Sequence, residues 1–333
     1  MKKILLIGTG GTIASVSTPD GLTPSIDASE MLDYVKDAAS EYDITPLQLF
    51  NIDSTNMESD HWLAIARAIE DHYEDFDGFV LCHGTDTMAY TAAALSYLIQ
   101  HSSKPIVMTG AQKPINLDNT DARTNLMDSL RFAADPRAHD VHLVFQGSVI
   151  RGTRIQKERT KSYNAFVSVN YPLVASIQDR HLFYYIDDKE ASTHPVLFSH
   201  AMDPSVGLIK LIPMLRAETL YTIGAQYKAL IIESFGVGGL PNYQSGSMME
   251  TVERLIDEGH IIVMTTQVPY EGSDMSIYAV GKRAKEELDL WEAYDMTLPS
   301  AVTKLMWILA QNETRERAER LFHHTVNTDT LWH

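Results

Sequence analysis

Three short segments of this chain combine glycine with hydroxyl-bearing residues in a pattern that could do chemistry. They are residues 8–15 (GTGGTIAS), 53–56 (DSTN) and 83–87 (HGTDT), and each follows a short apolar run. Ligands of open parallel sheets bind outside the carboxyl ends of the strands. If the three apolar runs are strands of one sheet, their polar turns share one edge, which predicts a binding site there.

The third segment offers the sharpest chemistry, because Thr85 and Asp86 place a hydroxyl beside a carboxylate. The hydroxyl could relay a proton and the carboxylate could bind an ammonium group, but both residue types are also common helix caps. A threonine becomes a nucleophile only when a base removes its proton. A lysine can be that base when burial lowers its pKa to about 7–8, and the sequence alone does not single out one lysine. We expect the neighbouring His83 to be a hydrogen-bonded structural residue.

Nucleotide and metal sites fit the sequence poorly. A dinucleotide fingerprint requires a third glycine where the chain has Ile13, and no Gly-Lys-Ser/Thr phosphate loop is present. His139 and His142 are spaced like metal ligands, yet no carboxylate or cysteine pattern completes the set. The sequence contains no Gly-x-Ser-x-Gly motif, so it does not indicate a serine hydrolase of the α/β-hydrolase class. We therefore expect neither a cofactor nor a metal.

Alternating strands and helices must hold these turns in place, and the sequence has that alternation. Short apolar runs separated by stretches of helical period are typical of β/α units with a mostly parallel sheet. The strand-like runs are 3–8, 44–51, 77–82, 105–109 and 141–146. The helix-like runs are 28–39, 60–73, 87–100 and 121–134. We expect Ser59 to cap the second helix and Thr85 or Asp86 to cap the third.

The alternation falters after residue 172 and resumes after residue 205, which predicts a linker over 176–205. Further strands are expected at 207–211, 229–233 and 260–265, and helices at 246–258, 300–311 and 314–324. The predicted fold is α/β with two domains. Residues 1–175 form a larger catalytic domain with a Rossmann-like, mostly parallel sheet and helices on both faces, and residues 206–333 form a smaller α/β domain.

Charge and cysteine content exclude several classes of protein. The 333 residues include 27 Lys and Arg against 44 Asp and Glu, a net charge of −17. Such a chain repels phosphate backbones and anionic lipid, so we expect neither nucleic acid nor membrane as a partner. The single cysteine, Cys82, lies in an apolar run and is expected to pack in the core. No signal peptide and no long apolar segment is evident, which predicts a cytoplasmic protein.

Segments 9–15 and 83–88 resemble the two signature motifs of bacterial-type L-asparaginases. The resemblance extends over nearly the whole chain and includes four further segments. Residues 51–57 resemble the family's substrate-carboxylate segment, and residues 151–157 resemble the segment that carries its catalytic lysine. Residues 233–241 and 303–307 resemble C-terminal segments of the cytoplasmic, type I branch.

The resemblance implies hydrolysis of L-asparagine to L-aspartate and ammonia. It also allows a lesser activity on L-glutamine or D-asparagine. Thr12 would attack the side-chain amide and form an acyl-enzyme, which water then hydrolyses. A second triad of Thr85, Lys157 and Asp86 would relay protons. The remaining implied substrate-binding residues are Gly11, Asp53, Ser54, Thr55, Gly84, Ala111 and Gln112.

This chain departs from the family pattern in two places. Many members carry a tyrosine on the loop after the first motif, where this chain has Leu22, so the residue that activates Thr12 is not identified. Some type I members bind asparagine at an allosteric site that involves a cysteine after Thr-Thr-Gln, and the corresponding residue here is Val268. We expect residues 16–25 to form a lid over the substrate, with an ordinary surface loop as the alternative.

The family also implies a homodimer or homotetramer whose active site lies between subunits. Residues 273–278 are the candidate segment for reaching a neighbouring site. Two other functions compete with hydrolysis of free asparagine: an asparagine-binding sensor without turnover, and the glutaminase subunit of a tRNA-dependent amidotransferase. A sensor would not need Thr12, Thr85 and Lys157 together. The amidotransferase subunits carry an extra N-terminal domain, and a net charge of −17 disfavours tRNA.

Overall fold

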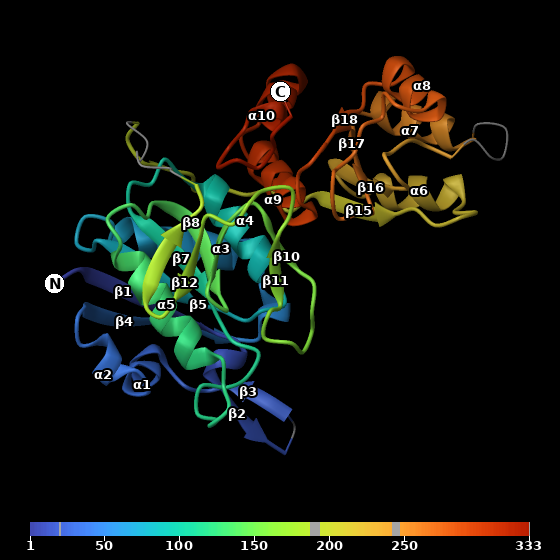
Figure 1. Ribbon diagram of the computed structural model, residues 1–333. Coiled ribbons are helices and arrows are strands. Elements are labelled where there is room, and N and C mark those ends of the chain that lie inside the picture. Colours follow the sequence, from blue (N-terminus) through green and yellow to red (C-terminus); the bar gives the residue numbers. More distant parts are fainter. Residues whose placement is uncertain (20, 187–193, 242–246, 333) are drawn as a thin grey trace. The chain divides into compact units, whose positions relative to one another are not determined.

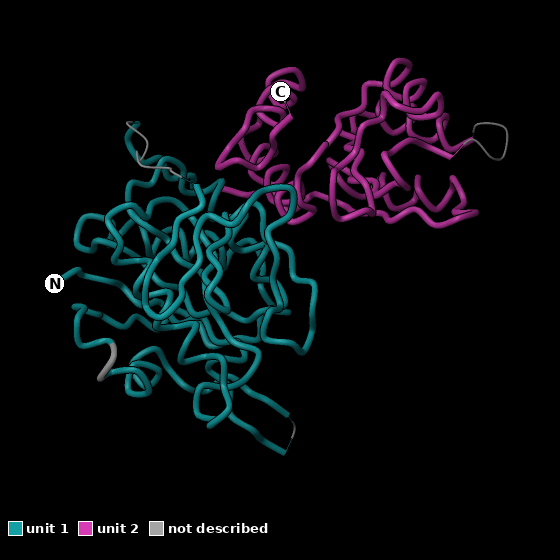
Figure 2. The backbone as a smooth tube through the Cα atoms, in the orientation of Figure 1, with its two compact units in different colours: residues 1–200 teal, residues 201–333 magenta. Residues whose placement is uncertain are grey.

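The computed structural model describes residues 1–19, 21–186, 194–241 and 247–332, apart from the side chains of residues 37 and 38. The chain divides into two compact units, residues 1–200 and residues 201–333 (Figure 2). Each unit contains its own sheet and its own buried apolar cluster. The two-domain α/β fold expected from the sequence is therefore present.

The N-terminal unit is built on an eight-stranded sheet (Figure 1). Its strands are β1 (Lys3–Gly10), β4 (Asp43–Ile52), β5 (Gly78–Cys82), β7 (Pro105–Thr109), β8 (Asp140–Phe145), β9 (Ser148–Arg151), β12 (Ala175–Gln178) and β13 (His181–Tyr184). Their order is β13-β12-β9-β8-β7-β5-β1-β4. The five neighbouring strands β4, β1, β5, β7 and β8 pair in parallel. The remaining strands, β9, β12 and β13, continue the sheet with antiparallel pairing. Because β4 and β5 flank β1 on opposite sides, the strand order reverses at β1, the position at which sheets of this class bind ligands.

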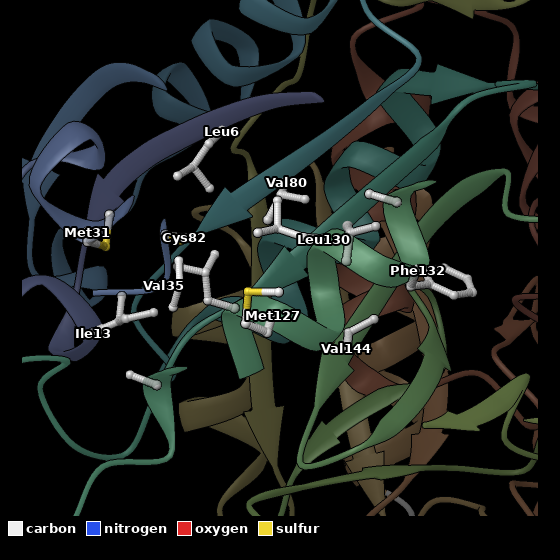
Figure 3. Close-up of a cluster of buried hydrophobic side chains, with 14 of the residues drawn as sticks. Leu6, Ile13, Met31, Val35, Val80, Cys82, Met127, Leu130, Phe132 and Val144 are labelled. Atoms are coloured by element: carbon white, nitrogen blue, oxygen red, sulfur yellow. The ribbon is translucent and has the colours of Figure 1, made fainter. Parts of the chain in front are cut away.

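Helices cover both faces of this sheet. The unit's helices are α1 (Ala28–Asp33), α2 (Lys36–Ala39), α3 (Ser59–Asp71), α4 (Met88–Leu98) and α5 (Ala122–Ala134), with short 3-10 turns η1 (Thr12–Ala14) and η2 (Ser54–Asn56). One face packs under α5, where Leu130 and Met127 meet Val80 and Cys82 (Figure 3). The alternate residues of the same strands, such as Leu81, are equally buried on the opposite face, where α4 contacts β8.

Two helix starts and one helix interior differ from the sequence prediction. Helix α3 begins at Ser59 and is capped by Glu58, whose side chain pairs reciprocally with the third helical residue. Helix α4 begins at Met88 with Thr87 at its N-cap position, whereas the side chains of Thr85 and Asp86 accept from Lys157 instead of capping the helix. The stretch predicted as one helix over 28–39 is two, α1 and α2, separated by a turn at 34–35.

Part of the predicted linker is sheet. Residues 175–184 form the hairpin β12–β13 at the edge of the large sheet, and β14 (Leu197–Phe198) pairs with β6 (Ile99–Gln100) in the same unit. Asp179 and Arg180, both with positive φ angles, form the tight turn that closes the hairpin. Because this turn is polar, the sequence pattern places it in the predicted linker. Residues 187–193 of the predicted linker lie outside the described residues.

The C-terminal unit has a parallel sheet with the order β15-β16-β17-β18. Its elements are β15 (Val206–Lys210), α6 (Ala217–Gly224), β16 (Ala229–Ser234), α7 (Ser247–Asp257), β17 (Ile261–Thr266), α8 (Ala279–Glu287), β18 (Trp291–Glu292), α9 (Leu298–Leu309) and α10 (Arg315–His323). The sequence prediction missed α6, α8 and β18. Helix α8 buries only Gly281 and Ala284, so it shows no apolar stripe that a periodicity argument could detect.

The chain after α10 is fixed to α9 by charges that are completely buried. The Lys304 ammonium lies 2.6 Å from the Asp329 carboxylate and donates a 2.7 Å hydrogen bond to the His324 carbonyl. Asp329 also accepts a hydrogen bond from the Val326 backbone at 2.9 Å. A buried ion pair of this kind is retained only when further hydrogen bonds satisfy its atoms, as they do here.

Candidate active site

The three polar turns meet at the carboxyl edge of the large sheet, as predicted. Gly11 has a φ of 76°, and a Cβ added there would lie 2.3 Å from both Cα and N of Gly84. A Cβ on Gly84 would in turn lie 2.5 Å from the Ser54 hydroxyl oxygen. The turns after β1 and β5 therefore touch through backbone, the Ser54 side chain of the turn after β4 packs against Gly84, and only glycine permits these approaches. The Thr87 hydroxyl strengthens the junction by donating to the Ser54 carbonyl at 2.7 Å.

A register shift brings the end of β1 into this junction. Gly8 pairs with Gln48 on β4, but Gly10 pairs with Ile52, so β4 has two more residues than β1 over this interval. The Gly11 amide then donates to the Ile52 carbonyl at 2.9 Å. Such irregularities re-aim a strand end next to a site. Here the shift places η1, which begins at Thr12, beside the Gly84 turn.

Thr85, Lys157 and Asp86 form a hydrogen-bonded triad. The Lys157 ammonium donates to the Thr85 hydroxyl at 2.8 Å and to the Asp86 carboxylate at 2.5 Å. Thr85 is buried and the lysine side chain is 16% exposed, whereas the Asp86 side chain is 59% exposed. The carboxylate is therefore open to a ligand, while the lysine and the threonine are shielded from water.

Lys157 reaches this position from a short hairpin. It ends β10 (Ile155–Lys157), which pairs antiparallel with β11 (Phe166–Ser168) and contacts α4. Helix α4 follows the HGTDT turn directly, so the contact between the hairpin and the helix holds the lysine against Thr85. Among the described lysines, this tertiary contact singles out Lys157 as the one that donates to Thr85.

Gln112 connects the triad to the same hairpin. Its side-chain oxygen accepts a 3.3 Å hydrogen bond from Thr85, and its Nε2 donates to the Ser162 carbonyl at 3.1 Å. The Gln112 backbone amide donates to the carboxylate of Asp121, the residue before α5. Burial raises the pKa of that carboxyl. Ala111, the preceding residue, is completely buried.

The segment after β4 supplies a second set of polar groups. Ser54 is buried, and Thr55 and Asp53 are exposed. The Asp53 carboxylate accepts from both the backbone amide and the hydroxyl of Thr55, each at 2.9 Å. Asp53 thereby fixes the turn η2 and orients the Thr55 hydroxyl.

Thr12 lies half-buried at the start of η1. Its hydroxyl makes no hydrogen bond to any of the described residues, although the backbone around it is fixed by the bond between the Ala14 amide and the Gly11 carbonyl. The next segment is a two-stranded ribbon, β2 (Ser15–Thr18) paired with β3 (Gly21–Pro24). Leu22 is half-exposed on this ribbon, and Asp20 at its tip lies outside the described residues.

His83 has a supporting role that the sequence suggested only in outline. The Thr91 hydroxyl accepts from the Trp62 indole at 2.9 Å and lies 3.0 Å from His83 Nε2, while His83 Nδ1 faces the Gly84 carbonyl, which can only accept. Nδ1 therefore carries the proton and donates to the Gly84 carbonyl at 2.6 Å, and Nε2 accepts from the Thr91 hydroxyl. Burial lowers the pKa of His83 to about 4, which keeps the ring neutral. His83 therefore positions the Gly84 turn.

The candidate segment 273–278 lies in the C-terminal unit. Glu292 accepts the Met275 amide at 2.9 Å, and the Asp274 carboxylate accepts the Ser276 hydroxyl at 2.5 Å. Ile277 and Tyr278 are exposed, and Tyr278 borders an apolar cavity of about 560 Å³ at the 234–241 loop.

None of the helices that the structure describes has the length and apolar character of a membrane-spanning segment.

Comparisons with known proteins agree on one family. The asparaginase N-terminal domain model matches residues 3–190, and the glutaminase/asparaginase C-terminal domain model matches residues 205–322. L-asparaginase of Thermococcus kodakarensis is 34% identical over 97% of this chain and 98% of its own length. L-asparaginase 1 of Escherichia coli is 33% identical over 93% and 92%.

Solved structures and a second group of relatives complete the comparison. The structure of the thermostable L-asparaginase from Thermococcus kodakarensis superposes with a TM-score of 0.93 at 33% identity, covering 99% of this chain and all of that one. L-asparaginase I from Vibrio cholerae superposes with a TM-score of 0.89 at 26% identity, covering 99% of each chain. A subunit of the glutamyl-tRNA(Gln) amidotransferase of Pyrococcus abyssi is 31% identical over 96% of this chain but only 75% of its own length.

Proposed function

Because the chain belongs to the asparaginase family of amidohydrolases, we propose that it hydrolyses L-asparagine to L-aspartate and ammonia. The observation that carries this proposal is the hydrogen-bonded triad of Thr85, Lys157 and Asp86 at the edge where the three glycine and hydroxyl turns meet. Hydrolysis proceeds in two half-reactions. No cofactor takes part in either.

In the first half-reaction the Thr12 hydroxyl oxygen attacks the carbon of the substrate's side-chain amide. The C–N bond breaks, ammonia leaves with the proton of the hydroxyl, and an ester joins Thr12 to the aspartyl group. In the second, water attacks the ester carbon and releases L-aspartate, which restores the hydroxyl. Backbone N–H groups near Gly11 and Thr85 stabilise the oxyanion, an effect of about 3–4 kcal/mol for each donor.

The triad relays the protons. Lys157, 2.8 Å from the Thr85 hydroxyl, draws its proton when the amine is neutral, and Thr85 passes protons to and from the reacting groups. The exposed carboxylate of Asp86 binds the α-ammonium group of the substrate. Ser54 and Thr55 bind its α-carboxylate on the turn that Asp53 fixes. Gly84, Ala111 and Gln112 line the amide end.

Two structural elements complete the proposed site. The β2–β3 ribbon begins three residues after Thr12 and closes over bound substrate as a lid. A second copy of the chain supplies residues 273–278, so that a homodimer or homotetramer has its sites between subunits. The exposed apolar side chains of Ile277 and Tyr278 support this assembly, because contiguous exposed apolar residues mark association surfaces.

The direct test is ammonia release by the purified protein across an L-asparagine titration, with L-glutamine and D-asparagine alongside. We expect rapid asparagine turnover that a Thr12→Ala variant abolishes, and a hyperbolic dependence on substrate concentration. Asparagine that binds without ammonia release would instead identify a sensor. Glutamine turnover that appears only with a partner protein would identify a component of an amidotransferase, the activity suggested by the glutamyl-tRNA(Gln) amidotransferase relatives.

A further inference from the structure

The side-chain amide of Gln112 has a fixed orientation, and this orientation determines where the Thr85 proton points. Gln112 Nε2 donates to two backbone carbonyls, that of Ser162 at 3.1 Å and that of Arg159 at 3.4 Å. Because a carbonyl can only accept, these contacts fix which end of the amide is nitrogen. The amide oxygen therefore faces Thr85, whose hydroxyl donates its proton to that oxygen at 3.3 Å.

With its proton directed at Gln112, the Thr85 hydroxyl is an acceptor toward Lys157. Lys157 is the donor in both of its contacts, to Thr85 at 2.8 Å and to the Asp86 carboxylate at 2.5 Å. An ammonium group suits these contacts, whereas the lone pair of a neutral amine meets no donor within them. The arrangement thus holds the lysine in its protonated form, which cannot take a proton from Thr85.

The charged groups around Lys157 come from several elements. Asp86 forms an ion pair with it, which favours the ammonium form. On the same hairpin, Glu158 pairs with Arg159 at 3.6 Å. Helix α4 and strand β11 contain no acidic, basic or histidine residue, and Asp121 accepts from two backbone amides of the turn after β7. A neutral replacement of the glutamine leaves all of these charges in place.

We propose that Gln112 is a positioning residue for the hydrolysis, because it holds the Thr85 proton away from Lys157 and so sets the pH above which the relay operates. This inference rests on the proposed function. For the relay to work, Lys157 loses one proton to solvent and the Thr85 O–H bond turns from Gln112 to the neutral amine. Thr85 then passes its proton to the amine as it takes one from the attacking hydroxyl or water. Gln112 competes with the amine for the Thr85 proton, so it stabilises the inactive arrangement.

The variant Gln112→Met tests the competition without substrate. It keeps the length of the side chain and removes the competing acceptor. We expect the neutral form of Lys157 to be favoured about threefold, the effect of one long hydrogen bond, so that the lysine titrates about half a pH unit lower. NMR of the full chain enriched at lysine Cε measures this titration, and Lys157→Met identifies the signal. An unchanged titration in Gln112→Met overturns the proposal.

The same change should appear in turnover. In Gln112→Met the rising limb of kcat for L-asparagine against pH should lie about half a pH unit lower than in the native protein. Gln112→Glu keeps an acceptor and adds a negative charge, so it should move the limb to higher pH. A residue that only supports the packing would change kcat by the same factor at every pH. Movement of the limb in the same direction in both variants would also overturn the proposal.

The two readouts separate this inference from the proposed function. If the native protein releases no ammonia from L-asparagine, the proposed function fails, whereas the lysine titration still reports whether Gln112 competes for the Thr85 proton. If the native protein turns over L-asparagine and the titration does not move, the role of Gln112 alone is rejected. Melting temperatures of both variants verify that they are folded.

Discussion

At the scale of single residues, the site depends on two kinds of contact that have different tolerance to change. The glycine contacts between Gly11 and Gly84, and between Gly84 and Ser54, leave no space for a methyl group. The Thr85–Lys157–Asp86 contacts are between side chains, and Asp86 is exposed enough to exchange partners. Substitutions in the first group would displace whole turns, whereas substitutions in the second remove a chemical function from an intact frame.

The second group yields a prediction for Lys157. Lys157→Met removes the proton acceptor while keeping the length of the side chain, and we expect kcat for L-asparagine to fall by about 10²–10⁴. Lys161→Met, on the same hairpin but exposed, is the matched control and should retain native kcat. Steady-state kinetics and the melting temperature of both variants decide the matter. A native kcat in Lys157→Met would remove the lysine from the mechanism.

At the scale of elements, the β2–β3 ribbon and the segment after α10 differ in how firmly each is bound to the rest of its own unit. Among the described residues, the two strands of the ribbon pair with each other through four residue pairs, from Ser15–Pro24 to Thr18–Gly21, and Val16 packs against the apolar cluster of the unit. The segment after α10 is held by the buried Lys304–Asp329 pair and by Asp295, whose carboxylate accepts from Thr330 and Leu331. The first attachment permits movement, and the second resists it.

The ribbon should respond to ligand. We expect thermolysin to cleave at Leu22 in the free protein and to do so at least several-fold more slowly with saturating L-aspartate, because closure would order the ribbon. Cleavage at the exposed Leu197, in the same unit, should be unaffected and serves as the internal control. Equal cleavage rates at Leu22 with and without L-aspartate would show that the ribbon is not a lid.

Removing one member of the buried Lys304–Asp329 pair should lower the free energy of unfolding strongly, whereas replacing both members with apolar residues should lower it little. Lys304→Met leaves the Asp329 carboxylate buried without its counter-ion, and we expect a loss of about 3–5 kcal/mol in the free energy of unfolding. The double variant Lys304→Met with Asp329→Leu should recover most of that loss. Urea unfolding of the three proteins tests both statements. Equal stabilities of the single and double variants would contradict this account of the pair.

The sequence predicts the elements with strong periodicity and the turns at strand ends, but not contacts that depend on tertiary packing. The positions of Thr85 and Asp86 follow from a strand end and a motif. Lys157 lies about 70 positions further along the chain on a three-residue strand. The family resemblance of residues 151–157 predicts its role, but the pattern of strands and turns does not, because only the contact between its hairpin and α4 brings it to Thr85. The reciprocal cap at Glu58 was missed because His61, rather than Glu or Gln, completes it.

At the scale of the whole molecule, the stability of the fold should depend on pH through its buried histidines. His83 and His142 are completely buried, and burial lowers the pKa of each. In the unfolded chain a histidine binds a proton below about pH 6.5, whereas folded His83 binds it only near pH 4. Between these values the unfolded state holds more protons, so the free energy of unfolding decreases as the pH falls.

For His83 the pKa difference corresponds to a loss of about 3 kcal/mol across that window. The variant His83→Gln should therefore lose less stability than the native protein between pH 7 and pH 4.5, when both are compared by urea unfolding. Carboxylates titrate in both proteins and cancel in the difference. Parallel stability profiles for native and variant would show that His83 does not contribute.

Assembly is the other property of the whole molecule. If residues 273–278 complete a neighbour's site, Thr12→Ala should be inactive, and a variant with Asp274, Met275 and Ser276 changed to alanine should also lose activity. Refolding the two together should restore about a quarter of native activity, because half of the random dimers contain one intact site out of two. Mixtures no more active than their components would place each site within one chain.

The buried thiol in β5 gives this chain a practical use. Cys82 is completely buried and burial raises its pKa to about 12, so the single native cysteine is inert toward maleimides while the fold is intact. A cysteine placed at Leu22 would then be the only reactive one, without any need for a cysteine-free background. A fluorophore attached there would report the position of the ribbon in real time, on the same molecules whose turnover is being counted.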